Sequence, residues 1–289
     1  MARPKDAFVP ELIYPSDVDD AAAELARLGD EGEPIAGATW VMLGPLYRRP
    51  TKMNFVSVGD LAELKQLETT DATATIGAAV THSQLVDSIS GDRPLAVLAE
   101  AAAGTPRGIG NVATVAGNIC ANPYAAADLV PALLVLDGQV EIRDGDAARS
   151  VALADLTDGS PGPGALVTGI RASAISEASR SVYERITVRA SGEEAVASVA
   201  LAVELEGNTV SEARVAFGSV EARSRRCAEA ENALVGKPLD AETAAAAGEA
   251  AAAAATIVGD ADAPADYKSR VLPGLMKRAA ARIAAGKEA

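Results

Sequence analysis

Apolar positions recur at helical spacing in several stretches of this chain. Ser16 to Asp19 is typical of a capping box, alanines and leucines follow at helical spacing to Leu28, and Gly29 suits a C-terminal stop. The same pattern predicts further helices, and the final one is expected to break or bend near Pro273-Gly274. These predicted helices span 81–88, 94–103, 128–136, 241–256 and 267–285.

β-Branched and apolar runs between the helical stretches predict strands. Gly207-Asn208 separates two such runs and predicts a hairpin turn. The run 167–170 is expected at a sheet edge, and the polar, small-residue stretch 172–181 indicates a domain boundary. The predicted strands are 55–58, 73–78, 139–142, 167–170, 199–205 and 209–217.

Two turns rich in glycine and alanine carry the strongest chemical signal. Small side chains let a backbone approach a ligand closely, and consecutive N–H groups in such turns form an anion-binding concavity. Either turn alone is more often a plain tight turn. Together, with Asp128 at the start of a later helix, they favour a pyrophosphate held from two sides and hence a flavin dinucleotide. The turns are Ile35–Val41 and Ala113–Asn118.

Length and charge narrow the classes of partner. A chain of 289 residues favours about two domains, and a formal net charge of −14 opposes non-specific nucleic-acid binding. An anionic ligand must then be held by local dipoles. Cys120 and Cys227 suit free thiols in a reducing cytoplasm. We expect a cytoplasmic protein without signal peptide, membrane span or nucleic-acid partner.

Side chains for hydrolytic or metal chemistry are scarce. Neither GxGxxG nor a P-loop motif is present, and His82 is the single histidine, whose default interpretation is a structural or surface residue. A metal site in this chain is not expected. Flavins carry their own redox chemistry and need mainly binding and orientation from the protein. The composition therefore fits a flavoprotein that passes electrons.

Several segments resemble the FAD-binding medium subunit of molybdenum hydroxylases, the carbon monoxide dehydrogenase and xanthine dehydrogenase family. The resemblance covers nearly the whole chain, and its most specific part is the second turn followed by Ala-Asp-Leu. It rests on Phe8, 15–28, 35–41, Ile76-Gly77-Ala78 with Thr81 and Leu85, 111–118, 126–133, Tyr183-Glu184-Arg185 with Arg189, 196–218, 266–268 and 278–279.

The resemblance implies an α+β fold. A two-part FAD-binding domain of the PCMH type would span 1–177, with subdomains of about 1–55 and 56–177. A smaller C-terminal domain with an antiparallel sheet and helices would span 178–289.

The resemblance also implies a FAD site. The two turns would hold the pyrophosphate, Asp128 would accept from ribose or ribityl hydroxyls, Tyr124 would approach the flavin, and Arg185 would lie near the isoalloxazine. The cofactor-binding residues implied are Ile35, Ala36, Gly37, Ala38, Thr39, Trp40, Ile109, Ala113, Thr114, Gly117, Asn118, Ala121, Tyr124, Asp128, Leu166, Val167 and Arg185.

Five positions that depart from the family pattern bear on the site. Ala38 and Ala116 replace glycines, which costs about 1 kcal/mol wherever φ must be positive. Trp40 stands in place of a small polar residue and Gly110 in place of a basic one. Arg185 replaces lysine, and these two cations are not equivalent because arginine presents a planar fork.

The implied function is electron transfer without a catalytic side chain. A small subunit with [2Fe-2S] clusters would deliver electrons, a large subunit would carry the molybdenum cofactor, and FAD would pass electrons to an external acceptor. The assembly would be a heterotrimer or its dimer. Two alternatives remain open: a self-contained flavin reductase of related fold, and an assembly subunit without FAD.

Overall fold

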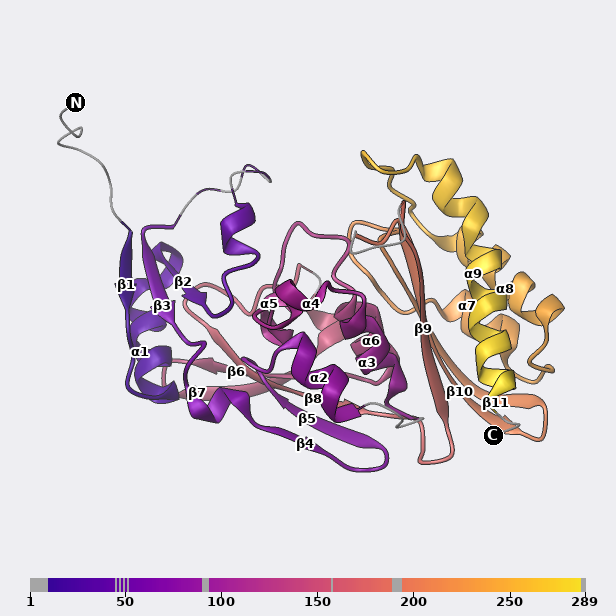
Figure 1. Cartoon of the computed structure of the whole chain (residues 1–289), viewed down its shortest axis with the longest axis horizontal. Coiled ribbons are helices and arrows are strands. Elements are labelled where there is room, and N and C mark those ends of the chain that lie inside the picture. Colours follow the sequence, from indigo (N-terminus) through magenta and orange to yellow (C-terminus); the bar gives the residue numbers. More distant parts are fainter. Residues whose placement is uncertain are drawn as a thin grey trace.

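The computed structural model describes residues 10–44, 46, 48, 50, 52–89, 94–156, 158–188 and 194–286. Phe8 and Arg189, which contribute to the resemblance, lie outside these residues. Within the described part, the strands form two three-stranded sheets and one five-stranded sheet, which follow one another along the longest axis of the molecule (Figure 1).

The first sheet is parallel and lies at one end of the molecule. Its strands β1 (Glu11–Ile13), β2 (Gly32–Ile35) and β3 (Asn54–Ser57) have the order β1-β3-β2, and α1 (Val18–Leu28) packs on them. Asp17 is the N-cap of α1 and accepts from the Asp20 N–H at 2.8 Å, so the capping pair lies one residue later than predicted. Gly29 ends this helix as predicted.

The central sheet is antiparallel, with the order β4-β5-β8-β6-β7. The prediction that 167–170 lies at an edge is wrong, because β8 pairs with β5 on one side and β6 on the other. The apolar run is the middle of an eight-residue strand in which Val167, Ile170 and Ala172 are buried. The strands are β4 (Leu67–Thr69), β5 (Thr73–Gly77), β6 (Gln139–Asp144), β7 (Ala147–Ala152) and β8 (Leu166–Ser173).

The helices between β5 and β6 lie on one side of the central sheet (Figure 1). The second Gly-rich turn proves to be a helix start, since Thr114 is the N-cap of α5 and its Oγ1 accepts from the Gly117 N–H at 3.2 Å. Every residue of α6 is buried. The helices are α2 (His82–Ile89), α3 (Ala96–Ala103), α4 (Arg107–Gly110), α5 (Val115–Ile119) and α6 (Leu129–Val135).

The third sheet has the order β11-β10-β9, and the helices that follow β11 cover its outer face (Figure 1). The predicted hairpin turn is confirmed at Gly207, whose φ is +63°. The final helix does not break at Pro273, because α9 runs through it with Leu272 and Leu275 in the core, whereas a bend there stays a prediction. The elements are β9 (Arg180–Ile186), β10 (Ala197–Glu206), β11 (Thr209–Gly218), α7 (Ala228–Leu234), α8 (Ala241–Ala254) and α9. Helix α9 spans Ala265–Ala285.

Strand β10 is buried on both faces, which joins the two cores of the molecule. Val199 and Leu201 pack with α7–α9, whereas Ala200 and Ala202 belong to the core formed with α2–α6. This alternation follows from the two-residue period of a strand. The small alanine face lets α6 pack close to the sheet.

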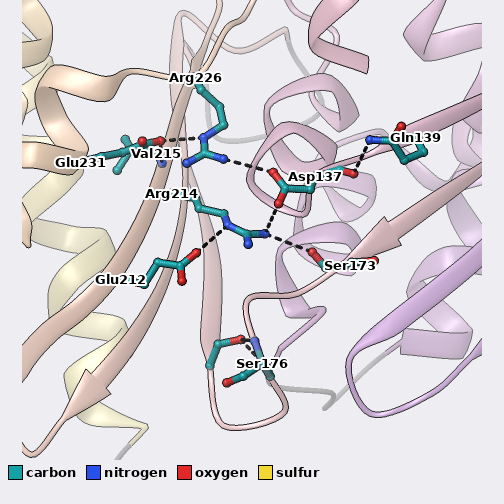
Figure 2. A network of polar contacts seen from close by, with 10 residues as sticks. Asp137, Gln139, Ser173, Ser176, Glu212, Arg214, Val215, Arg226 and Glu231 are labelled. Atoms are coloured by element: carbon teal, nitrogen blue, oxygen red, sulfur yellow. Dashed lines mark hydrogen bonds and ion pairs between the residues drawn. The ribbon is translucent and has the colours of Figure 1, made fainter. Parts of the chain in front are cut away.

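A polar network closes the junction between the central and third sheets (Figure 2). Asp137, in the turn after α6, pairs with Arg214 at 2.8 Å and with Arg226 at 3.1 Å. Arg226 also pairs with Glu231 at 2.7 Å, and Arg214 donates to the Ser173 carbonyl at 3.3 Å. Asp137 therefore binds two cations of the third sheet region.

The architecture is α+β, as the resemblance implied. Among the described residues, no helix combines the length and the apolar character needed to cross a lipid bilayer.

Candidate functional site

Two cavities lie on either side of the segments 36–41 and 113–118. The first has a volume of about 380 Å³ and lies between the turn 36–41 and the loop 158–167. The second has a volume of about 420 Å³ and extends toward Asp128 and Arg185. Both are lined by Thr39, Trp40, Thr114 and Gly117. These four residues therefore lie where the two cavities adjoin, a region called the passage below.

The turn after β2 offers backbone donors at this passage. Within the described residues, the N–H groups of Gly37, Ala38 and Thr39 donate no hydrogen bond to the protein. A Cβ on Gly37 would overlap the Val112 carbonyl oxygen, so this position requires glycine. Ala38 has a φ of +58°, the conformation in which alanine is strained. Three consecutive free donors form a concavity suited to an anion.

Within the described residues, the second segment has no run of consecutive free donors, because most of its N–H groups are already hydrogen-bonded. The N–H groups of Val115 and Ala116 donate to the Val80 and Ala78 carbonyls, at 2.9 Å and 3.2 Å. Asn118 Oδ1 accepts from the Leu129 N–H at 3.2 Å and so holds the start of α6. Gly117 lines both cavities, and a Cβ there would lie 2.9 Å from Thr114 Oγ1. The expectation of symmetric N–H cradles in both turns therefore needs correction.

Asp128 is the centre of a buried polar cluster in the second cavity. The Tyr183 hydroxyl donates to Asp128 Oδ1 at 2.6 Å, and Arg185 Nη1 donates to Oδ2 at 3.0 Å. Burial raises the pKa of Asp128 to about 6, against the opposing effects of Arg185 and Tyr183. A Cβ on Gly104 would overlap Arg185 Nη1, so glycine here makes room for the ion pair.

Two aromatic side chains meet at the passage. The rings of Trp40 and Tyr124 have centroids 5.2 Å apart and planes inclined by 44°. Both residues line the second cavity, and Trp40 lines the first as well. Trp40, which stands in place of the small polar residue of the family pattern, thus places its indole ring where the two cavities adjoin.

Cys120 and His82 are both held neutral at physiological pH. Burial raises the pKa of the Cys120 thiol to about 12 and lowers the pKa of His82 to about 4. His82 is 2% exposed and lines the second cavity, and its Nδ1 lies 2.9 Å from Thr105 Oγ1. His82 is therefore a structural histidine, as expected, at the wall of a binding site.

Of the residues predicted to bind the cofactor, all except Ile35 line one or both cavities. Ile35 ends β2, and its carbonyl accepts from the Val58 N–H at 2.9 Å. Leu166 and Val167 line the first cavity, whereas Ile109, Tyr124, Asp128 and Arg185 line the second. That these residues contact FAD stays a prediction.

The sequence pattern missed several wall residues. The loop Asp158–Gly164 contributes to the wall of the first cavity and was not among the predicted site residues. His82, Thr105 and Glu194 line the second cavity without belonging to any glycine-rich motif. A signal for Thr105 was present in the irregular stretch after Gly104, because such stretches often approach ligands.

Two family models match the chain. Residues 7–172 match the FAD binding domain in molybdopterin dehydrogenase, and residues 182–283 match the CO dehydrogenase flavoprotein C-terminal domain. Together with the donor-lined passage between two cavities, these matches define a flavoprotein that binds FAD. The chain belongs to the family of FAD-binding medium subunits of molybdenum hydroxylases, and it is an oxidoreductase subunit.

Relatives of known activity are similar over nearly their whole length. The alpha subunit of the 6-hydroxypseudooxynicotine dehydrogenase complex of Paenarthrobacter nicotinovorans is 28% identical over 94% of this chain and 93% of its own. The carbon monoxide dehydrogenase medium chain of Hydrogenophaga pseudoflava is 27% identical, over 93% and 95%. A solved structure of the Hydrogenophaga enzyme superposes with a TM-score of 0.86 at 26% identity, covering 96% of this chain and 97% of that one.

Proposed function

We propose that this chain is the electron-transferring flavin subunit of a molybdenum hydroxylase complex. It receives electrons from the [2Fe-2S] clusters of a small subunit and passes them to an external acceptor. A large subunit carries the molybdenum cofactor and oxidises the substrate. The assembly is a heterotrimer or its dimer. The names of the relatives, which are medium chains or subunits of complexes, support this role.

The observation that carries the proposal is the passage with its free donors. The N–H groups of Gly37, Ala38 and Thr39 hold the FAD pyrophosphate, with the Thr39 and Thr114 hydroxyls beside them. The two ring systems occupy the two cavities. Backbone N–H dipoles close to the pyrophosphate are needed because the chain carries a formal charge of −14, which repels an anionic dinucleotide at long range. Bound FAD supplies one- and two-electron chemistry.

The chain's own residues bind and orient the cofactor. Asp128 accepts hydrogen bonds from hydroxyl groups of FAD in the second cavity, where Arg185 and Tyr183 hold its carboxylate in place. Leu166 and Val167 provide an apolar wall in the first cavity. No catalytic side chain is required, because the substrate reacts on a different subunit.

The cofactor is tested first on the purified chain. We expect a flavin absorption spectrum and a released chromophore with the mass of FAD in a 1:1 ratio. Gly117→Val should abolish FAD retention, because a β-branched side chain fills the passage shared by both cavities. Gly108→Val is the matched control, since a Cβ there meets no atom within 4 Å. A Gly117→Val variant with a full FAD complement would place the site elsewhere.

The electron-transfer role is tested in the purified complex. With wild-type chain, addition of substrate should bleach both the iron–sulfur and the flavin absorption and reduce an external acceptor. With Gly117→Val, the iron–sulfur absorption should still bleach, but reduction of the acceptor should be lost. An isolated chain that oxidises reduced nicotinamide at the rate of the complex would instead favour a self-contained reductase.

A further inference from the structure

The open edge of β9 is held by side chains from α3 and α9, which both contact this strand (Figure 1). Among the described strands β9 pairs with β10 alone, so the peptide groups on its other edge need partners elsewhere. The Tyr183 N–H donates to Glu100 Oε2 of α3 at 2.7 Å, and Arg282 Nη1 of α9 donates to the Tyr183 carbonyl at 2.9 Å. Arg278 Nη2, also of α9, donates to the Arg185 carbonyl at 3.2 Å. Side chains of α3 and α9 therefore take the place of a neighbouring strand at this edge.

The same residues of β9 carry the side chains that hold Asp128. Because a strand alternates its side chains between two faces, Tyr183 and Arg185 extend toward Asp128. Glu184 extends from the opposite face toward α9. The backbone groups held by α3 and α9 and the side chains that bind Asp128 therefore belong to the same two residues. A shift of this backbone displaces both partners of the Asp128 carboxylate at once.

Two carboxylates keep the arginines of α9 in place. Arg278 and Arg282 lie four residues apart on α9 and hence on one face of the helix. The Glu184 carboxylate lies 3.3 Å from Arg278 Nε and 3.0 Å from Arg282 Nη1. Arg282 Nη2 also pairs with Glu100, the residue that accepts from the Tyr183 N–H. The Glu184 and Glu100 side chains are 16% and 29% exposed, so water competes less for these pairs than for a fully exposed pair. The network therefore runs from α9 across β9 to α3.

We propose that Arg282 and Arg278 are positioning residues of the FAD site. By holding the outer edge of β9, they keep Tyr183 and Arg185 where these side chains orient the Asp128 carboxylate in the second cavity. The inference rests on the function proposed above. Arg282 has the larger part, because it donates to the Tyr183 carbonyl and pairs with the carboxylate that accepts the N–H of the same residue. Neither arginine is among the residues that line the second cavity, so an effect on FAD has to pass through β9.

The first measurement is the dissociation constant of FAD, obtained by titrating the FAD-free full-length chain and following flavin fluorescence. Arg282→Met keeps an apolar stem but loses every donor, and it should raise the constant about 5-fold or more. Arg282→Lys can still donate to the Tyr183 carbonyl and should restore part of the affinity. Arg278→Met, which frees one carbonyl, should raise the constant by a smaller factor. An unchanged constant in Arg282→Met would overturn the proposal, and an unchanged constant in Arg278→Met would overturn the role of Arg278.

A matched control and a double-mutant cycle separate positioning from a general loosening of the fold. Arg270 lies on the same helix and pairs with Asp266 on the surface, so Arg270→Met should leave the dissociation constant unchanged. If Arg282 acts through the Asp128 carboxylate, Arg282→Met should change the constant by less than about 2-fold in an Asp128→Asn background. A loosened fold would weaken FAD binding by the same factor in both backgrounds. Equal factors would therefore overturn the proposal.

The titration also distinguishes this inference from the proposed function. A wild-type chain that binds no FAD refutes the FAD site itself. A wild-type chain that binds FAD stoichiometrically, together with an Arg282→Met variant that binds it equally tightly, leaves the FAD site standing and refutes only the positioning by α9.

Discussion

At the scale of single residues, the turn after β2 combines three different requirements. Gly37 must lack a side chain because it lies against Val112, whereas Ala38 has a side chain despite a φ of +58°. Ala116, the other alanine in place of a glycine, lies inside α5 and needs no positive φ. The two departures from the family pattern therefore have opposite energetic consequences.

Ala38→Gly should stabilise the FAD-free chain by about 0.5–1 kcal/mol. Glycine removes the strain of left-handed alanine, which exceeds the extra backbone entropy that glycine loses on folding. Ala116→Gly is the control, and should destabilise by about 1 kcal/mol because glycine is a poor helix former. Urea unfolding measures both. If Ala38→Gly destabilises as much as the control, the turn does not hold this conformation in solution.

Asp128 should make stability depend on pH. Its folded pKa of about 6 lies above the ordinary value of 3.8, so the folded state binds this proton more tightly than the unfolded state. The resulting stabilisation is complete below pH 4 and is lost as pH rises through 6. Relative to Asp128→Asn, which does not titrate, the free energy of unfolding of the wild type should fall by about 3 kcal/mol between pH 3 and 7.

Urea unfolding of both proteins at several pH values measures this difference. Above pH 7 the difference in the free energy of unfolding between the two proteins should no longer change with pH, because Asp128 is ionised in both the folded and unfolded states. A difference that does not change between pH 4 and 7 would mean that burial does not raise this pKa.

Most site residues could be predicted at this scale because they belong to short motifs. Thr105 and His82 could not, because their proximity arises from the packing of α2 against the bend after α3. A run of free donors was predicted for both turns, but among the described residues only the first turn has consecutive ones. In the second, Val80 and Ala78 accept the hydrogen bonds, and the sequence pattern contains no sign of that pairing.

At the scale of elements, apolar periodicity located the long helices and the hairpin but missed several pieces. β7 has mostly exposed residues, so it has no apolar pattern to recognise. The pattern did not predict β9 as a strand, because its arginines and glutamate interrupt the alternation of apolar and polar residues. Helix α9 continues through Pro273 because the packing of its buried face overrides the tendency of proline to break a helix.

That packing predicts the effect of a mutation in α8. A Cβ on Gly248 would lie 2.5 Å from the Pro273 Cα and 2.6 Å from its nitrogen. Gly248→Ala should therefore push α8 and α9 apart and destabilise by about 2 kcal/mol, although alanine is the better helix former. Urea unfolding followed by circular dichroism measures the change.

A matched variant in the same helix isolates the steric effect. Ala246 is exposed, and Ala246→Gly should cost about 1 kcal/mol through helix propensity alone. If Gly248→Ala instead gains stability by that amount, the helices have room to accommodate the methyl group.

At the scale of the whole molecule, the resemblance predicted two domains, and we propose 1–177, with its subdomains of about 1–55 and 56–177, and 178–289 as their bounds. The cores are not independent, because β10 contributes Ala200 and Ala202 to one core and Val199 and Leu201 to the other. Such sharing comes from a strand buried on both faces, which periodicity alone does not distinguish from other buried segments. The two domains should therefore unfold together.

The Asp137 network tests how strongly the two domains are coupled (Figure 2). Asp137→Asn keeps a residue type that tolerates its φ of +46° but removes the charge that Arg214 and Arg226 share. The Arg214 side chain is 13% exposed, so its charge loses a partner in a poorly solvated place. We expect a loss of about 1 kcal/mol, smaller at high salt because ion pairs are screened.

Trp40, the single tryptophan, reports on the N-terminal part by fluorescence, while circular dichroism follows the whole chain. Both transitions should shift together in Asp137→Asn, because the domains share a core. Asp266→Asn removes a pair whose side chains are 71% and 69% exposed, and it should leave both transitions in place. If the unfolding midpoint of Asp137→Asn measured by fluorescence differs from the midpoint measured by circular dichroism, the Asp137 network, rather than β10, couples the two domains.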